Sequence, residues 1–121
     1  MLGKPIGTYV TLESEWLRKY DESIHEPFVT LLTKHLKNML GSASRVLVVG
    51  LGNRNVTPDA LGPHVIDNLY ITRHLLREGV VCGVREISAI CPGVMAQTGI
   101  ETVHMLKAIC KEINISPEDD I

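Results

Sequence analysis

Asp59 is the first candidate for chemistry in this chain, because of the segment that leads to it. The apolar run Val46–Val49 predicts a strand that is buried on both faces, as strands of parallel sheets are. A glycine-rich loop follows this strand and contains Asp59. In open α/β sheets, ligands and catalytic groups gather at the carboxyl ends of the strands. The position of Asp59 therefore indicates a functional carboxylate.

A structural role for Asp59 stays open beside the functional one. Thr57, Pro58 and Asp59 resemble the start of a helix, with a hydroxyl cap, a proline in the first turn and an acid near the positive end of the helix dipole. Gly62–Pro63 would disrupt a helix begun at Pro58, which predicts that the continuous helix starts at Pro63. Asp59 would then lie on an irregular loop and be free to point into a cleft.

The chemistry of an acid pair needs a second carboxylate close to the first, because the two groups share a proton when they activate water. The other acid nearby in the sequence is Asp67, one turn along the predicted helix, where we expect it to be solvated. The residues alone therefore indicate no partner for Asp59 within this chain.

Three other motifs point to different chemistry. Gly50-Leu51-Gly52 begins like a dinucleotide-binding turn, but Asn55 replaces the third glycine, and no Walker motif follows. Cys91 and His64 could form a thiolate pair for acyl transfer, and the alternative is that Cys91 is a small buried side chain. The other histidines lack the spacing of a catalytic metal site, so we expect neither a metal nor a cofactor.

The composition favours one domain with a single core, since 45% of the 121 residues are hydrophobic. The net charge is −2, with 12 basic and 14 acidic residues spread through the chain, which argues against binding to nucleic acid or to an anionic membrane. No long apolar run indicates a membrane span or a signal peptide, so we expect a cytoplasmic location. Three cysteines without CxxC spacing predict reduced, mostly buried thiols.

Hydrophobic periodicity predicts alternating strands and helices. A short strand is expected at Thr8–Leu12, and Pro117–Ile121 indicates a turn that feeds a further strand. Between them we expect, in order, a helix at Asp21–Leu40, a strand at Arg45–Gly50, a helix from Pro63 to Gly79, a strand at Val80–Ile90, and a helix from about Ala96 to the residue before Ser116. This order predicts right-handed parallel crossovers in a layered α/β fold.

Four segments of the chain match a known pattern: GKPIGTYVTLE (Gly3 to Glu13), VVGLGNRNVTPDALGP (Val48 to Pro63), VIDNLYITRHL (Val65 to Leu75) and SAICPGVMAQTGIET (Ser88 to Thr102). In this order they resemble the spore germination protease family. These proteins are aspartate-type endopeptidases that degrade small acid-soluble spore proteins. The resemblance implies a three-layer α/β/α fold with a mostly parallel sheet, similar to hydrogenase maturation peptidases, and it implies that Asp59 is one of two catalytic aspartates.

The resemblance also assigns roles around Asp59. Residues that would shape its loop are Gly50, Gly52, Asn53, Asn55 and Gly62, and residues that would form the facing wall of a substrate cleft are Pro92, Gly93, Thr98 and Gly99. Cys91 replaces what is usually a small residue of the motif, so its thiol is expected to be incidental. The implied substrates are small acid-soluble spore proteins in the spore core or forespore, and the full-length protein is expected to be a homotetramer.

We expect the chain to be a single, truncated central fragment of the catalytic domain. The second aspartate of the family belongs to a DALAAR-like motif on the next strand, and that motif and the family's removable propeptide are not found in this sequence. The fragment is therefore expected to be inactive by itself. Two alternatives remain: a non-enzymatic sporulation or assembly module of the same fold, and a nickel-dependent peptidase of the hydrogenase-maturation type.

Overall fold

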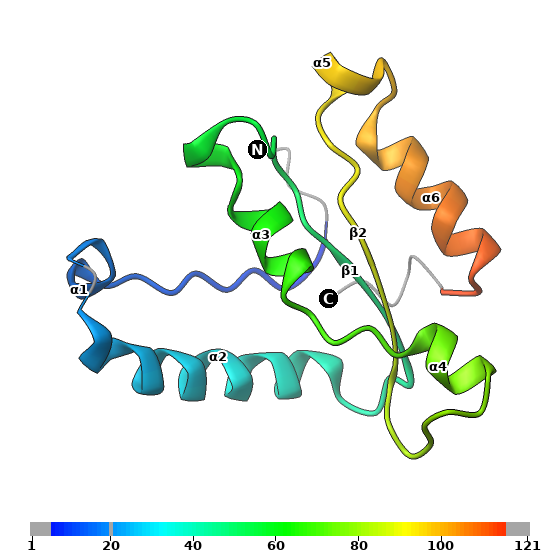
Figure 1. The fold of residues 1–121 in the computed structure, drawn as a ribbon, viewed down its shortest axis with the longest axis horizontal. Helices are drawn as coiled ribbons and strands as arrows, with labels where there is room; N and C mark the ends of the chain where they lie inside the picture. Colours follow the sequence, from blue (N-terminus) through cyan, green and yellow to red (C-terminus); the bar gives the residue numbers. More distant parts are fainter. Residues whose placement is uncertain (1–5, 20, 116–121) are drawn as a thin grey trace. The chain divides into compact units, whose positions relative to one another are not determined.

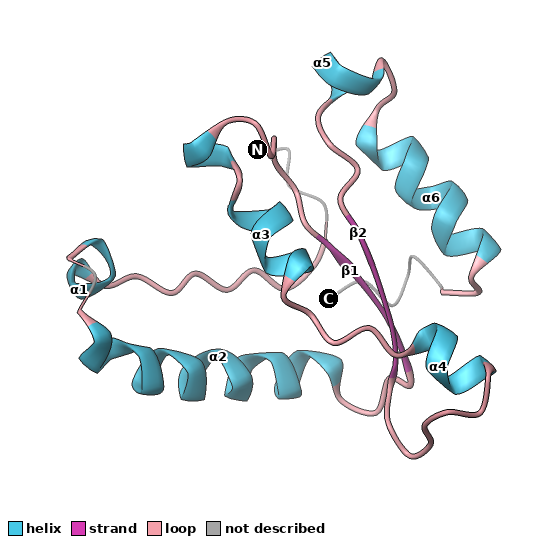
Figure 2. Ribbon diagram, viewed as in Figure 1, coloured by secondary structure: helices cyan, strands magenta, loops and turns pink. Residues whose placement is uncertain are grey.

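The computed structural model describes residues 6–19 and 21–115. These residues fall into two compact units, divided between Ser42 and Ala43. Figure 1 colours the described residues along the sequence, and Figure 2 marks their helices and strands. The expected strand at Pro117–Ile121 lies outside the described residues.

The first unit consists of an extended segment and three helical elements. Helix α1 (Glu15–Arg18) is capped by Ser14, whose hydroxyl accepts a hydrogen bond of 3.2 Å from the Trp16 N–H. A short 3₁₀ turn, η1 (Glu22–Ile24), leads into α2 (His25–Leu40), which ends at Gly41 with a φ of 51°. The predicted helix at Asp21–Leu40 is therefore confirmed, apart from its first turn.

The predicted strand at Thr8–Leu12 is wrong, because this segment adopts no regular secondary structure. Alternating polar and β-branched residues suit a half-buried strand, but a strand also needs a neighbour that accepts and donates its backbone hydrogen bonds. The sheet of the described residues contains two strands, and this segment is neither of them.

The second unit is built on two parallel strands, β1 (Arg45–Val49) and β2 (Glu86–Ile90). Arg45 lies opposite Glu86, and Val49 lies opposite Ile90. The Gly50 N–H continues the ladder with a hydrogen bond of 3.0 Å to the Ile90 carbonyl. The parallel pairing is as predicted, whereas β2 is shorter than the expected Val80–Ile90 because the chain turns before Glu86. The unit is thus a mixed α/β structure with a small parallel sheet.

The connection from β1 to β2 contains η2 (Thr57–Asp59), α3 (Leu61–Asp67) and α4 (Arg73–Arg77). The single helix predicted from Pro63 to Gly79 is wrong, because the chain leaves the helix between α3 and α4. Thr72 explains the break. Its N–H donates to the Ile87 carbonyl at 3.1 Å, and its hydroxyl accepts from the Ile87 N–H at 2.8 Å and donates to the Arg85 carbonyl at 2.5 Å.

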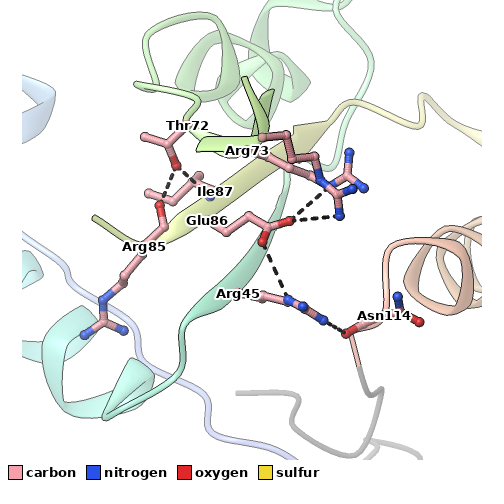
Figure 3. A network of polar contacts seen from close by, with 8 residues as sticks. Arg45, Thr72, Arg73, Arg85, Glu86, Ile87 and Asn114 are labelled. Carbon is pink, nitrogen blue, oxygen red and sulfur yellow. Dashed lines mark hydrogen bonds and ion pairs between the residues drawn. The ribbon is translucent and has the colours of Figure 1, made fainter. Parts of the chain in front are cut away.

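Thr72 is only 2% exposed, so its polar groups must find partners inside the protein. Figure 3 shows its side chain beside the backbone of Arg85 and Ile87. In a continuous helix, the N–H of a residue donates to the carbonyl four residues earlier. Docking of Thr72 on β2 is therefore incompatible with a continuous helix from α3 into α4, which begins directly after Thr72.

The amino ends of the two strands are joined by a cluster of charged side chains around Glu86 (Figure 3). The Glu86 carboxylate is contacted by Arg45 at 3.6 Å, by Arg73 at 3.2 Å and by Arg77 at 3.6 Å. Arg45 also donates to the Asn114 carbonyl at 3.4 Å, just after the last helix. This ionic cluster ties both strands, α4 and the end of the described chain together at one edge of the sheet.

After β2 the chain forms α5 (Met95–Thr98) and α6 (Thr102–Glu112). The helix predicted from Ala96 is therefore broken once, at Gly99, where φ is 69°. The thiols were expected to be mostly buried; Cys110 on α6 is buried, Cys91 is half-buried and Cys82 is exposed. Among the helices that the structure describes, none combines the length and the apolar character needed to cross a bilayer.

Candidate functional site

The candidate site lies at the carboxyl ends of the two strands. Because β1 and β2 are parallel, their following loops leave the sheet at the same edge. The first loop runs from Gly50 to Ala60 and contains Asp59, and the second runs from Cys91 to Val94 and leads into α5. This is the edge at which the sequence placed the chemistry.

Two glycines allow the first loop to lie directly against α3. A Cβ atom on Gly50 would lie 2.5 Å from the Gly62 carbonyl oxygen and 2.5 Å from Cγ1 of Ile66. A Cβ atom on Gly62 would overlap the backbone of Leu51. Real side chains do not tolerate such contacts. Glycine at both positions therefore sets the close approach of helix and loop.

Asp59 is held by its own loop. One carboxylate oxygen, Oδ2, accepts a hydrogen bond of 2.8 Å from the Asn53 N–H, and the Asp59 N–H donates to the Val56 carbonyl at 2.8 Å. Gly52 stands next to this contact with a φ of +131°, and a Cβ there would overlap the Asp59 carbonyl. The Asp59 residue is exposed to solvent. Its side chain is thus oriented by a backbone amide while remaining accessible.

Asp59 does not cap a helix. It ends the 3₁₀ turn η2, and α3 begins two residues later at Leu61, with Ala60 as its N-cap and no side-chain capping bond. The expected start at Pro63 is two residues late, and Pro63 lies in the first turn, where proline is tolerated. The hydroxyl of Thr57 likewise caps neither element. The helix-start interpretation of this segment therefore explains the proline but not the acid.

Gln97, on α5, connects the two loops and was missed by the sequence analysis. Its Nε2 donates to Asn53 Oδ1 at 3.1 Å, and its Oε1 accepts from the Val94 N–H at 3.2 Å. Asn53 Oδ1 also accepts from the Asn55 N–H at 2.9 Å. Glutamine three residues after the N-cap is a known feature of helix starts, and this was the available signal.

The other residues expected at the facing wall have local roles in the described structure. Pro92 is buried, and Gly93 adopts a φ of 75°. The Thr98 hydroxyl accepts from the Ile100 N–H at 3.1 Å, and Gly99 ends α5. Of these side chains and that of Gln97, it is Gln97 that carries a hydrogen bond to the Asp59 loop.

Asp67 is exposed, as expected, and it is also paired with a neighbouring side chain. Arg54, from the first loop, donates two hydrogen bonds to its carboxylate, at 2.5 Å and 3.0 Å. Nη2 of Arg54 also lies 3.7 Å from the Cys91 sulfur, while Nδ1 of His64 lies 3.9 Å from Asp67. The described contacts therefore bring His64 to Asp67 and Arg54 to Cys91, and they do not form the Cys91–His64 pair considered from the sequence.

The hydrogen bonds from Arg54 lower the pKa of Asp67 below its usual value, and the pairing raises the pKa of Arg54. A depressed carboxyl pKa in the folded state contributes stability above the unfolded pKa of about 3.9, and this contribution disappears as the pH falls through the folded pKa. Because the pair is exposed, the effect is small and screened by salt.

We expect Asp67→Asn to lower the melting temperature at pH 7 and to have no effect once the pH is below the folded pKa of Asp67. Thermal unfolding of both proteins from pH 7 to pH 2.5 measures this difference, and repeating it in 1 M salt should reduce the difference at pH 7. A difference that stays constant over the whole pH range would contradict the pairing seen here.

Metal ligands are not gathered in this region. Within the part of the chain that the structure describes, no three side chains of His, Cys, Asp or Glu come together as they do around a metal ion.

The chain belongs to the class of peptidases, because residues 1–117 match the model of a peptidase family. The model is described as the germination protease, and the chain therefore belongs to the germination protease family. This confirms the resemblance seen in the four sequence segments.

Curated relatives agree with the family model. The chain is 47% identical to the germination protease of Priestia megaterium. The match covers 93% of this chain and 33% of the relative. The chain is also 43% identical to that of Bacillus velezensis, over 91% of the chain and 32% of the relative, and 42% identical to that of Caldanaerobacter subterraneus subsp. tengcongensis, over 93% and 36%. The chain thus spans about a third of the length of these relatives.

Proposed function

We propose that this chain supplies Asp59 as one of two catalytic carboxylates of an aspartate-type endopeptidase that degrades small acid-soluble spore proteins in the germinating spore. Membership of the germination protease family supports proteolysis during germination. The observation that supports the role of Asp59 is its hydrogen bond to the Asn53 N–H, which orients an accessible carboxylate at the carboxyl edge of the sheet.

We assign different tasks to the two carboxylate oxygens of Asp59. The Asn53 amide binds Oδ2, and among the described residues no donor occupies Oδ1. Oδ1 is the oxygen that would take a proton from water as the water attacks the peptide carbon, and a second, protonated acid would donate to the peptide oxygen. The role of the loop is to hold Asp59 in one orientation, so that little reorganisation accompanies the reaction.

We further propose that the second acid, and the remaining strands of a three-layer α/β/α sheet similar to that of hydrogenase maturation peptidases, come from polypeptide beyond this chain. The parallel pairing of β1 and β2 supports this proposal. The complete protein is proposed to act as a homotetramer in the spore core, without a metal or other cofactor.

The chain and the longest polypeptide encoded by its reading frame should differ sharply in activity. On purified small acid-soluble spore proteins, we expect cleavage by the longer polypeptide and none by the 121-residue chain. The reason is that the proposed mechanism needs a second carboxyl group close to Asp59. Gel electrophoresis and mass spectrometry of the products measure this, with an unfolded protein unrelated to spores as the control substrate. Equal cleavage by the chain alone would sink the two-acid proposal, and inactivity of the longer polypeptide would sink the proposed protease.

A further inference from the structure

The amide of Gln97 lies between the two loops that follow β1 and β2. It is separated by 44 positions from Asn53, to which its Nε2 donates at 3.1 Å. Asn53 in turn donates its backbone N–H to Oδ2 of Asp59. A continuous path of hydrogen bonds therefore runs from α5, through Asn53, to the candidate catalytic carboxylate.

The orientation of both side-chain amides is fixed by backbone donors. The Val94 N–H can only donate, so the group of Gln97 that faces it must be the acceptor Oε1. The Asn55 N–H can also only donate, so it must face Oδ1 of Asn53. The two assignments leave Nε2 of Gln97 pointing at Oδ1 of Asn53, which is a matched donor and acceptor.

The second loop is shaped to admit this side chain. A Cβ atom on Gly93 would lie 3.0 Å from Oε1 of Gln97, which is tighter than most contacts of a Cβ atom, and the φ of 75° at Gly93 also favours glycine. Asn53 is therefore held from two sides, by Asn55 within its own loop and by Gln97 from the neighbouring one. Restricting the Asn53 side chain restricts the direction of its N–H.

We propose that Gln97 is a positioning residue for Asp59: by holding Asn53, it fixes the amide that orients the carboxylate, and so joins the second loop to the catalytic one. This inference rests on the proposed function of Asp59. Gln97 does not touch Asp59 and takes no part in proton transfer.

Two substitutions separate this role from a local one at the start of α5. Gln97→Glu keeps an acceptor for the Val94 N–H but replaces the Nε2 donor by an oxygen that faces Oδ1 of Asn53. If Asn53 turns its own amide to donate to the new carboxylate, it loses the bond from Asn55. Gln97→Met removes both bonds of Gln97. Ala96→Gln, on the same short helix, is the control that adds an amide outside this path.

The first readout is hydrogen exchange of the Asn53 N–H, measured by NMR on the 121-residue chain. Loss of the hydrogen bond between Gln97 and Asn53 is expected to speed exchange of the Asn53 N–H by about two- to tenfold in both Gln97 variants, and Ala96→Gln should leave it unchanged. The Ile87 N–H, which is bonded to Thr72 in the sheet, serves as the internal reference for intact folding. Exchange of Asn53 at the wild-type rate in Gln97→Glu would overturn the proposal.

The second readout is proteolysis by the longest polypeptide of the reading frame. We expect Gln97→Glu to lower kcat by about three- to thirtyfold with KM unchanged, since misorientation of one catalytic group affects the chemical step more than substrate binding. Faster Asn53 exchange with an unchanged kcat would overturn the positioning role. If Asp59→Asn leaves proteolysis intact, it is instead the proposed function that fails, and the exchange data still decide whether Gln97 orders the loop.

Discussion

Asp59→Asn, introduced into the longest polypeptide of the reading frame, is expected to reduce hydrolysis of small acid-soluble spore proteins by about a hundredfold to ten-thousandfold, the usual contribution of a general base. The substitution keeps the shape of the side chain, and its amide oxygen can still accept the hydrogen bond from the Asn53 N–H. It removes the negative charge and the site that takes the proton. The loss should therefore appear in kcat, with the fold preserved.

The matched control is Glu112→Gln, which neutralises an exposed acid at the end of α6, away from both loops. It should retain wild-type cleavage. A non-enzymatic sporulation module predicts that Asp59→Asn has no effect on function, and a nickel peptidase predicts bound nickel in the active protein that metal analysis detects. Proteolysis within a few-fold of wild type in Asp59→Asn would remove Asp59 from the catalytic machinery.

Gly62→Ala is expected to destabilise the second unit, although alanine normally stabilises a helix by about 0.5 to 1 kcal/mol relative to glycine. Gly62 lies in the first turn of α3, and its added Cβ would overlap the backbone of Leu51. Because backbone cannot rotate away as a flexible side chain can, loop and helix must separate, at a cost of about 1 to 3 kcal/mol. Chemical denaturation of both proteins measures the difference.

His64→Ala provides the control on the same helix. His64 is exposed, and its replacement by alanine improves helix propensity without adding atoms near the loop. Its stability should stay within about 0.5 kcal/mol of wild type, as is usual for surface substitutions. A Gly62→Ala protein that is as stable as wild type, or more so, would show that the close contact between α3 and the loop is not maintained in solution.

Local sequence pattern predicted the elements that nearby residues mark clearly. The apolar run of β1 and the long apolar stripe of α2 were both found in this way, although β1 also needs β2 as its hydrogen-bonded neighbour. The break between α3 and α4 could not be found in this way, because it results from the docking of Thr72 on Ile87, 15 positions away. Thr8–Leu12 shows the converse, since its alternation suits a strand and the described sheet does not include it.

For the candidate site, too, one part could be predicted from the sequence and another part could not. The place of Asp59 after a buried strand could be predicted, because the rule about strand ends needs only the order of elements. The contacts of Gln97 with Asn53, and of Arg54 with Asp67, link residues 44 and 13 positions apart. The place of Gln97 three residues after a helix N-cap was a local signal for its bond to Val94, but nothing in the spacing indicates its contact with Asn53 or the contact of Arg54 with Asp67.

The buried Thr72, which docks on Ile87 of β2, limits where a further strand could join the sheet. The N–H and the carbonyl of Ile87 point away from β1, and both are hydrogen-bonded to Thr72. A further strand therefore cannot pair with β2 at Ile87. On the other side of β1, no side chain among the described residues blocks the backbone groups in this way. We expect an additional strand to pair with β1 on that side, which would place one end of the strand beside the loop that contains Asp59.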